Sequence, residues 1–358
     1  MKKLINTLQI SFSVIGAVIG AGFITGREIM RFFYGKEWFY GVIVVFFVLF
    51  ILLFALLNIK NEKIIYLIEK SNYAIFIFNI LIMASMLGAT DSLAYSIFSL
   101  STKFPVFSIG LLVVSTYCCF GGMEKLSKVN LFIVPIILII FFVAVAVLPY
   151  GEKEFSDGIT NKHFDYFSYG FMNIFLAQPF LLKIKREKSE FSPFGVAIIS
   201  SIILSVSICA FLRILSEDCL ICDVPLILLA KNNYLLYFLF ALIIFISIFT
   251  TLTSVQYPFV MSKKSKFDFL PLVCASIIAF IISRIGFFVI VDKIYPIIAV
   301  ISMIFYAFIF AIWLFLALKE QRKRTLNQPK YIKQQYLPLQ DQVLIPDRRK
   351  RKDNQDLA

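Results

Sequence analysis

Long apolar runs alternate with short polar stretches along almost the whole chain. A membrane helix needs about 20 apolar residues to cross roughly 30 Å of hydrocarbon, and runs near that length or longer recur. The pattern predicts ten membrane segments, at about residues 5–33, 38–58, 73–101, 105–121, 129–149, 166–183, 193–215, 233–260, 268–287 and 294–318. We therefore expect an all-α integral membrane protein whose transmembrane region covers residues 1–318.

Glycine interrupts the first of these segments in its middle. Four of the 15 glycines lie between Gly16 and Gly26. Glycine destabilises a helix interior by about 1 kcal/mol relative to alanine, so we expect this segment to unwind and expose backbone groups. Irregular backbone inside a membrane is tolerated only where it lines a cavity or is buried in protein. A second interpretation is close helix packing through small residues at four-residue spacing, since Gly16 and Gly20 are so spaced.

Composition agrees with a membrane protein. Hydrophobic residues make up 60% of the chain, charged residues make up 16%, and the mean hydropathy is +0.86. A soluble domain of this length does not show such values. The first apolar run follows Lys3 directly and is too long for a signal-peptide core, so we expect it to be retained.

The positive charges predict an orientation. With the N-terminus inside, 25 of the 35 lysine and arginine residues fall on the inner side, as the positive-inside rule requires. We expect a multi-pass protein of the plasma membrane with both termini in the cytoplasm. Topology accounts for the net charge of +13, so nucleic acid is not an expected partner. The basic tail, residues 319–358, is expected to be disordered, or alternatively to lie on anionic lipid.

The residues that usually serve metals and catalysis are sparse. Cys219-x-x-Cys222 has no second cysteine pair and no nearby histidine, which argues against zinc. Whether the two cysteines form a disulfide stays open. His163 is the single histidine and no phosphate-binding glycine-lysine motif is present. We expect no enzymatic activity and no direct use of ATP.

The number of segments predicts an inverted repeat. Ten segments divide into two sets of five, over about residues 5–149 and 166–318, and an odd number per half makes the halves enter the membrane from opposite sides. In the sixth segment, Pro179 removes a backbone donor and disfavours helix at Gln178. We expect the first and sixth segments to be broken, which indicates a binding site near the membrane midplane.

Two motifs resemble a known family. The run VIGAGFITGREIMRFF, from Val18 to Phe33, resembles the VGAGFASGQEI…FF opening of the YkvI-type bacterial membrane proteins, which are relatives of the amino acid–polyamine–cation transporters. The run VNLFIVP, from Val129 to Pro135, resembles the start of that family's fifth helix. The resemblance implies a LeuT-type fold, with segments one, two, six and seven forming a bundle against segments three, four, eight and nine. The chain departs from the family in the third segment, at Gly88 to Ser92.

This resemblance and the expected break place a solute site in the first and sixth segments. Amides freed by unwinding, together with the positive end of the helix that follows, suit a carboxylate. Asn173 and Gln178 would add side-chain hydrogen bonds. The candidate solute-binding residues are Gly20, Ala21, Gly22, Phe23, Thr25, Gly26, Asn173 and Gln178.

Two carboxylates are candidates for ion coupling. Asp91 lies deep in a predicted membrane segment, where an ionisable group is costly and indicates function. It is a candidate proton carrier; the competing interpretation is a structural ion pair with Arg27 or Arg31. Glu28 lies at the end of the glycine-rich motif, where a gate, an ion pair and a ligand are all open roles.

Hydroxyl side chains in the eighth segment indicate a sodium site. Thr250, Thr251 and Ser254 lie about one turn apart and offer the oxygen ligands that hard cations take. The resemblance implies that they bind sodium together with the carbonyls of Gly20 and Phe23. The alternative is that these hydroxyls only bond the preceding turn of their own helix.

The sequence favours a secondary transporter of a small amino-acid-like or other compact polar solute, coupled to sodium or protons and working by alternating access. The expected partners are this solute and the lipid bilayer, and the sequence leaves protein partners open. The alternative is a nutrient-binding membrane receptor subunit that resembles those of spore germinant receptors. Dissipating the ion gradient abolishes accumulation by a transporter, whereas a receptor binds without accumulating.

Overall fold

The computed structural model describes residues 2–98, 105–119, 123–151, 163–187, 190–260 and 270–326. Within these ranges the regular structure is helical and no strand occurs. The predicted basic tail beyond residue 326 lies outside the described residues, as does the end of the predicted segment 105–121. The chain falls into two units, residues 1–309 and 310–358.

Helices occur in all ten predicted segments. The first half contains α1 (Lys2–Val18), α2 (Ala21–Ile24), α3 (Arg27–Phe33), α4 (Trp38–Asn58), α5 (Glu62–Phe98), α6 (Val106–Cys119) and α7 (Met123–Val147). The second half contains α8 (His163–Glu187), α9 (Pro193–Ile214), η1 (Glu217–Ile221), α10 (Pro225–Leu229), α11 (Tyr234–Gln256), η2 (Tyr257–Val260), α12 (Leu270–Ser283), α13 (Phe287–Val289), η3 (Ile290–Ile294) and α14 (Tyr295–Leu326).

Several of these helices are long and apolar enough to cross a membrane. By length and composition, six stretches of the described chain qualify: Trp38–Asn58, Ile75–Phe98, Asn130–Val147, Pro193–Ile214, Tyr234–Val260 and Phe287–Lys319. Helices α6 and α12 are apolar but shorter, and the first predicted segment is divided into three helices. The chain is therefore a multi-pass membrane protein, while ten spans and an inverted repeat remain predictions.

The first segment is broken at two points. Helix α1 ends at Val18, and Gly20 has an extended backbone before α2 begins. Between α2 and α3, Gly26 adopts a left-handed conformation with φ of 86°, which favours glycine because other residues are strained there. The unwinding predicted from the glycine cluster is thus present, and it divides the segment into α1, α2 and α3.

The sixth predicted segment differs from the expectation. Helix α8 runs without interruption from His163 to Glu187 and contains Pro179, so the predicted break in this segment is wrong. A proline removes only one backbone donor, and the packing of α8 against α1, α4 and α5 stabilises the rest of the helix.

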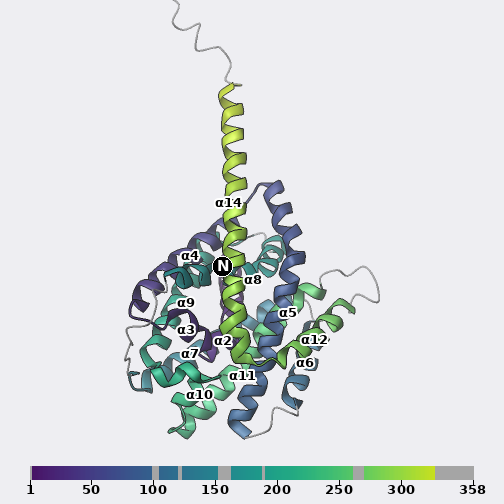
Figure 1. Cartoon of the computed structure of the whole chain (residues 1–358). Helices are drawn as coiled ribbons and strands as arrows, with labels where there is room; N and C mark the ends of the chain where they lie inside the picture. Colours follow the sequence, from purple (N-terminus) through teal and green to yellow (C-terminus); the bar gives the residue numbers. More distant parts are fainter. Residues whose placement is uncertain are drawn as a thin grey trace, which may run out of the picture. The chain divides into compact units, whose positions relative to one another are not determined.

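The broken segment lies among longer helices of the first unit. Helix α1 packs against α7, α9 and α11, α4 packs against α8 and α9, and α5 packs against α11 and α12. The short α2 contacts α5 and α11, and α3 contacts α8, α9 and η3 (Figure 1). Phe23 and Phe32 are fully buried. The irregular backbone is therefore enclosed by protein, as a break at membrane depth requires.

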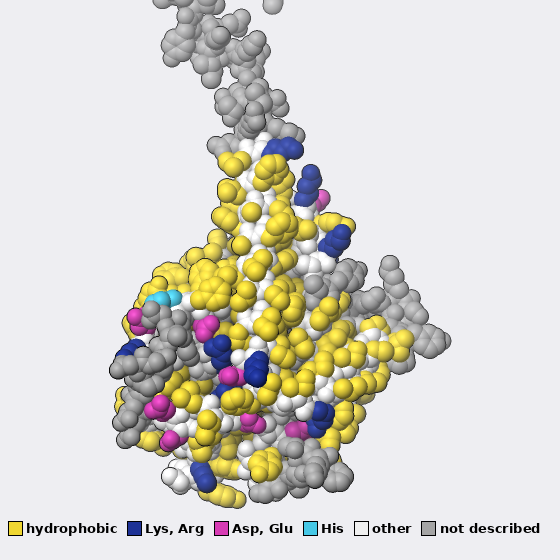
Figure 2. Space-filling view, viewed as in Figure 1, with side chains coloured by type: hydrophobic (Ala, Val, Ile, Leu, Met, Phe, Trp, Pro, Cys, Tyr) yellow, Lys and Arg dark blue, Asp and Glu magenta, His cyan; other side chains and the backbone are white. Residues whose placement is uncertain are grey.

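Hydrophobic side chains dominate the surface in the view of Figure 2. Phe47 of α4, Ile139 of α7 and Ile281 of α12 are 54%, 63% and 63% exposed. Such extensive apolar exposure is unfavourable in water. It is the expected surface of helices that face lipid.

Candidate functional site

Glu28 lies beside the break in the first segment. Helix α3 begins at Arg27 and places Glu28 in its first turn, where the side chain is only 5% exposed. The Glu28 Oε2 accepts a hydrogen bond of 3.1 Å from the hydroxyl of Tyr169 on α8. A Cβ atom on Gly22 would lie 2.0 Å from Glu28 Oε1. The absence of a side chain at Gly22 therefore makes room for the carboxyl group against α2.

Aromatic side chains lie close to this carboxyl group. The ring of Tyr169 lies 5.0 Å from that of Phe32 and 5.1 Å from that of Phe33. Tyr295 of α14 is close enough for the Glu28 charge to act on it, and its hydroxyl donates to Ser85 Oγ at 2.9 Å. Glu28 thus lies near tyrosine side chains of α8 and α14.

The backbone of the break is largely hydrogen-bonded within itself. The carbonyls of Gly20, Ala21 and Phe23 accept backbone N–H groups at 2.8 to 2.9 Å. The Gly22 carbonyl accepts the Thr25 hydroxyl at 3.2 Å. These predicted solute-binding residues lie together, but their carbonyls already have donors. The carboxyl group of Glu28 lies beside Gly22 of this break.

Hydroxyl groups of α11 reach the end of α1. The last carbonyls of a helix have no partner within it, and here Ser247 Oγ donates to the Ile19 carbonyl while Thr251 Oγ1 donates to the Gly16 carbonyl at 3.2 Å. Two hydroxyls of α11 therefore bind two carbonyls next to the first break.

The hydroxyls predicted to bind sodium have hydrogen-bond partners within the protein. Thr250 donates to the Ser247 carbonyl at 2.9 Å, and Ser254 donates to the Thr250 carbonyl at 2.8 Å, both within α11. These two hydroxyls are occupied by the preceding turn, as is frequent in membrane helices. The Thr251 hydroxyl donates to the Gly16 carbonyl, and its side chain also lies beside Gly20.

The two predicted ligands from the sixth segment have hydrogen-bond partners within the protein. Asn173 Nδ2 donates to the Tyr169 carbonyl at 3.0 Å, one turn earlier in α8. Gln178 donates to the Ile68 carbonyl at 3.4 Å and accepts from the Tyr306 hydroxyl at 2.9 Å. Gln178 thus binds residues of α5 and α14.

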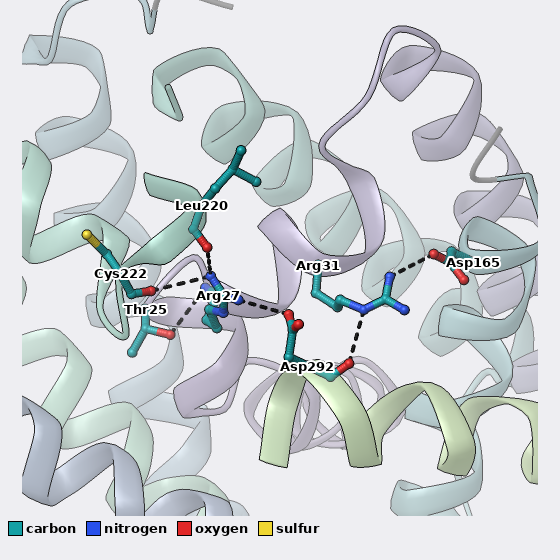
Figure 3. Close-up of polar contacts among 7 residues, drawn as sticks. All are labelled: Thr25, Arg27, Arg31, Asp165, Leu220, Cys222 and Asp292. Carbon is teal, nitrogen blue, oxygen red and sulfur yellow. Dashed lines mark hydrogen bonds and ion pairs between the residues drawn. The ribbon is translucent and has the colours of Figure 1, made fainter. Parts of the chain in front are cut away.

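Arg27 ties α3 to two distant parts of the chain (Figure 3). Its side chain is 4% exposed, and Nη2 lies 2.8 Å from Asp292 Oδ1 in η3. Nη1 donates to the Leu220 carbonyl in η1 and, at 3.5 Å, to the Cys222 carbonyl. The guanidinium carbon lies 3.6 Å from the ring centre of Phe288. Four groups from outside the first segment thus position this residue.

Arg31, one turn further along α3, makes a second set of contacts (Figure 3). Its Nη1 lies 2.9 Å from Asp165 Oδ2 on α8, and its Nε donates to the Asp292 carbonyl at 3.2 Å. Asp165 and Asp292 were not singled out in the sequence. The two arginines of the glycine-rich motif require acidic partners, and this requirement is the sequence feature that points to such residues.

Asp91 has a different partner from the one expected. It forms an ion pair with Arg284, which follows α12, and both Arg27 and Arg31 bind other carboxylates. The proposed pairing with Arg27 or Arg31 is therefore wrong. The Arg284 side chain is 35% exposed, so this is a partly solvated pair.

We predict a small effect for Asp91→Asn. Partly exposed ion pairs contribute at most about 1 kcal/mol, and an asparagine oxygen still accepts a hydrogen bond from Arg284. The free energy of unfolding should fall by about 1 kcal/mol or less, and any pH dependence of solute uptake should remain. Uptake that becomes independent of pH in this variant would instead identify Asp91 as the proton carrier.

Cys219 and Cys222 are both free thiols in this structure. Cys219 is fully buried, and burial raises the pKa of its thiol. The protonated form is therefore favoured, and it is a poor metal ligand. Cys222 acts here through its carbonyl, which accepts from Arg27.

The helices, the apolar surface and the enclosed break define an integral membrane protein. No protein-family model matches the chain. The chain is similar to the uncharacterized membrane protein YkvI of Bacillus subtilis (strain 168), with 29% identity over 351 residues that cover 89% of this chain and 97% of the relative. This similarity supports a membrane family of the YkvI type, as the opening motif predicts.

Proposed function

We propose that the chain is a secondary active transporter of a compact polar solute, working by alternating access in the plasma membrane with both termini in the cytoplasm. One observation supports the proposal most directly. The first segment is broken twice; the buried carboxyl group of Glu28 follows the second break, and a hydroxyl group of α11 binds the end of α1 before the first break. Irregular backbone enclosed next to such groups is characteristic of solute and ion sites in transporters. The proposal assigns no catalytic step to the chain.

The contacts of α3 support a role for this helix as a gate that closes one side of the site. Arg27 and Arg31 connect α3 to η1, η3 and α8 through two ion pairs and through carbonyl contacts. A solute that enters from this side requires these contacts to open. In alternating access, the protein switches between a state in which these contacts close this side and a state in which they are open and the opposite side is closed.

Sodium is the proposed coupling ion at the first break. Hard cations take oxygen ligands, and the Gly16 and Ile19 carbonyls with the Ser247 and Thr251 hydroxyls provide four oxygens from two elements. These donor types fit a sodium ion without a carboxylate. An ion bound here would link the end of α1 to α11.

We predict that Thr251→Val removes sodium-dependent stabilisation. A ligand that binds only the folded state stabilises it by about 2.7 kcal/mol at a hundredfold excess over Kd, and valine has no oxygen to offer. The measurement is thermal unfolding of the detergent-purified chain in sodium chloride and in potassium chloride at equal ionic strength. Thr253→Val is the matched control, since Thr253 donates only to the Thr250 carbonyl of its own helix. Sodium stabilisation that survives in the Thr251→Val protein would contradict this site.

The transporter proposal itself is tested by uptake into proteoliposomes that contain the purified chain. Radiolabelled amino acids and small amines are supplied with an inward sodium gradient, an inward proton gradient or no gradient. Accumulation that disappears when an ionophore collapses the gradient supports transport. Saturable binding without accumulation under every gradient would instead support a receptor.

A further inference from the structure

Glu28 is a buried carboxyl group without a cationic partner in the described part of the chain. Its one hydrogen bond is to the hydroxyl of Tyr169. The two arginines of the same helix, Arg27 and Arg31, form ion pairs with other carboxylates. A carboxylate removed from water is costly unless a cation or a proton compensates its charge. The compensating group must therefore come from outside the described contacts.

The surroundings of Glu28 favour an organic cation over a metal ion. A hard metal ion takes several oxygen ligands, but in the described structure the oxygen that contacts the Glu28 carboxyl group is the single hydroxyl of Tyr169. Aromatic rings lie close by, because Tyr169, whose hydroxyl donates to Glu28, packs against Phe32 and Phe33. Aromatic faces and a carboxylate together are a favourable environment for an ammonium group.

We propose that Glu28 binds the ammonium group of a compact organic cation and that a proton competes for the same carboxylate. The inference rests on the proposed transporter function and names its substrate class. Tyr169 positions the carboxyl group, and Gly22 makes the space that it occupies. A solute carboxylate at this break would meet the negative charge of Glu28, so acidic solutes are disfavoured. Since one carboxylate cannot hold both at once, binding of the organic cation and protonation of Glu28 exclude each other.

Few other titratable groups face Glu28 in the described structure. They are the hydroxyls of Tyr169 on α8 and Tyr295 on α14, while the guanidinium groups of Arg27 and Arg31 on α3 are held by Asp292 and Asp165. Protonation of Glu28 removes its charge and with it the attraction to an ammonium group. Affinity for the organic cation should therefore fall as the pH is lowered.

The test is thermal unfolding of the purified full-length chain with two pairs of probes in potassium chloride. Choline is compared with 3,3-dimethyl-1-butanol, which has the same shape without charge, and ethanolamine is compared with ethylene glycol. We expect at least one ammonium probe, and neither neutral analogue, to raise the melting temperature in a saturable manner. Glu28→Gln should weaken the affinity for that probe about tenfold or more, because a charge-assisted contact becomes a neutral one.

Two features keep this test decisive. The glutamine oxygen of Glu28→Gln still accepts from Tyr169, so the variant should fold. Glu37→Gln is the matched control, since Glu37 is 54% exposed, and it should bind the ammonium probe like the unchanged protein. Equal stabilisation by a neutral analogue, unchanged affinity in Glu28→Gln, or no shift with either ammonium probe would each overturn the inference.

Uptake of the same probes separates this inference from the transporter proposal. Ammonium binding that depends on Glu28 but never leads to gradient-driven accumulation would leave the inference standing and remove the transporter. Gradient-driven accumulation of a neutral or zwitterionic solute that is unaffected by Glu28→Gln would leave the transporter standing and remove the inference.

Discussion

Replacing Arg27 with alanine is expected to lower the free energy of unfolding by about 3 kcal/mol. Removing one partner of a buried ion pair costs about 3–5 kcal/mol because the other charge loses its compensation, and Asp292 is 34% exposed, which places the effect at the lower end. The variant also leaves the Leu220 carbonyl without its guanidinium donor. Thermal and chemical unfolding of the purified chain measures the change.

Two further variants show which contact causes the loss. Arg27→Lys keeps the charge, but a single ammonium group cannot bind Asp292 and the Leu220 carbonyl at once as the planar guanidinium group does. The stability of this variant should therefore lie between those of the unchanged protein and Arg27→Ala. Adding Asp292→Asn to Arg27→Ala should cost little more, since the partner is already lost. Strictly additive losses in this double variant would show that the two side chains are not coupled.

Replacing Gly22 with alanine is expected to displace the Glu28 carboxyl group and lower stability by about 1–3 kcal/mol, the usual cost of overpacking a filled interior. The added Cβ would lie 2.0 Å from Glu28 Oε1 and 2.6 Å from both Cδ and Cγ. A buried side chain has little space to move away. The same unfolding measurements, with the ammonium probes added, should show loss of both stability and binding.

Gly110 provides the matched control for this substitution. It lies on α6, and a Cβ atom added there meets nothing within 4 Å, so Gly110→Ala should leave stability unchanged or raise it by up to about 1 kcal/mol. Combining Gly22→Ala with Glu28→Ala removes the clashing atoms and should recover stability without recovering binding. A Gly22→Ala protein as stable as the unchanged chain would show that the carboxyl group does not need this space.

Some features of the site followed from local chemistry alone. Four glycines within one apolar run predicted an interrupted helix, and the breaks occur at Gly20 and Gly26. The single proline in the sixth segment predicted a break that is absent, because packing against neighbouring helices stabilises α8 through Pro179. Several helix-destabilising residues close together therefore interrupted the first segment despite its packing, whereas the single proline did not interrupt α8.

The membrane class, the helical segments and the interruption of the first segment could be predicted because they depend on runs of neighbouring residues. The partners of the charged and hydroxyl side chains could not. Arg27 binds Asp292, Asp91 binds Arg284, and Thr251 binds the Gly16 carbonyl, each across more than 190 residues of sequence. Such pairs form where packed helices bring distant side chains together, and only the tertiary structure decides which of several equally suited charges meet.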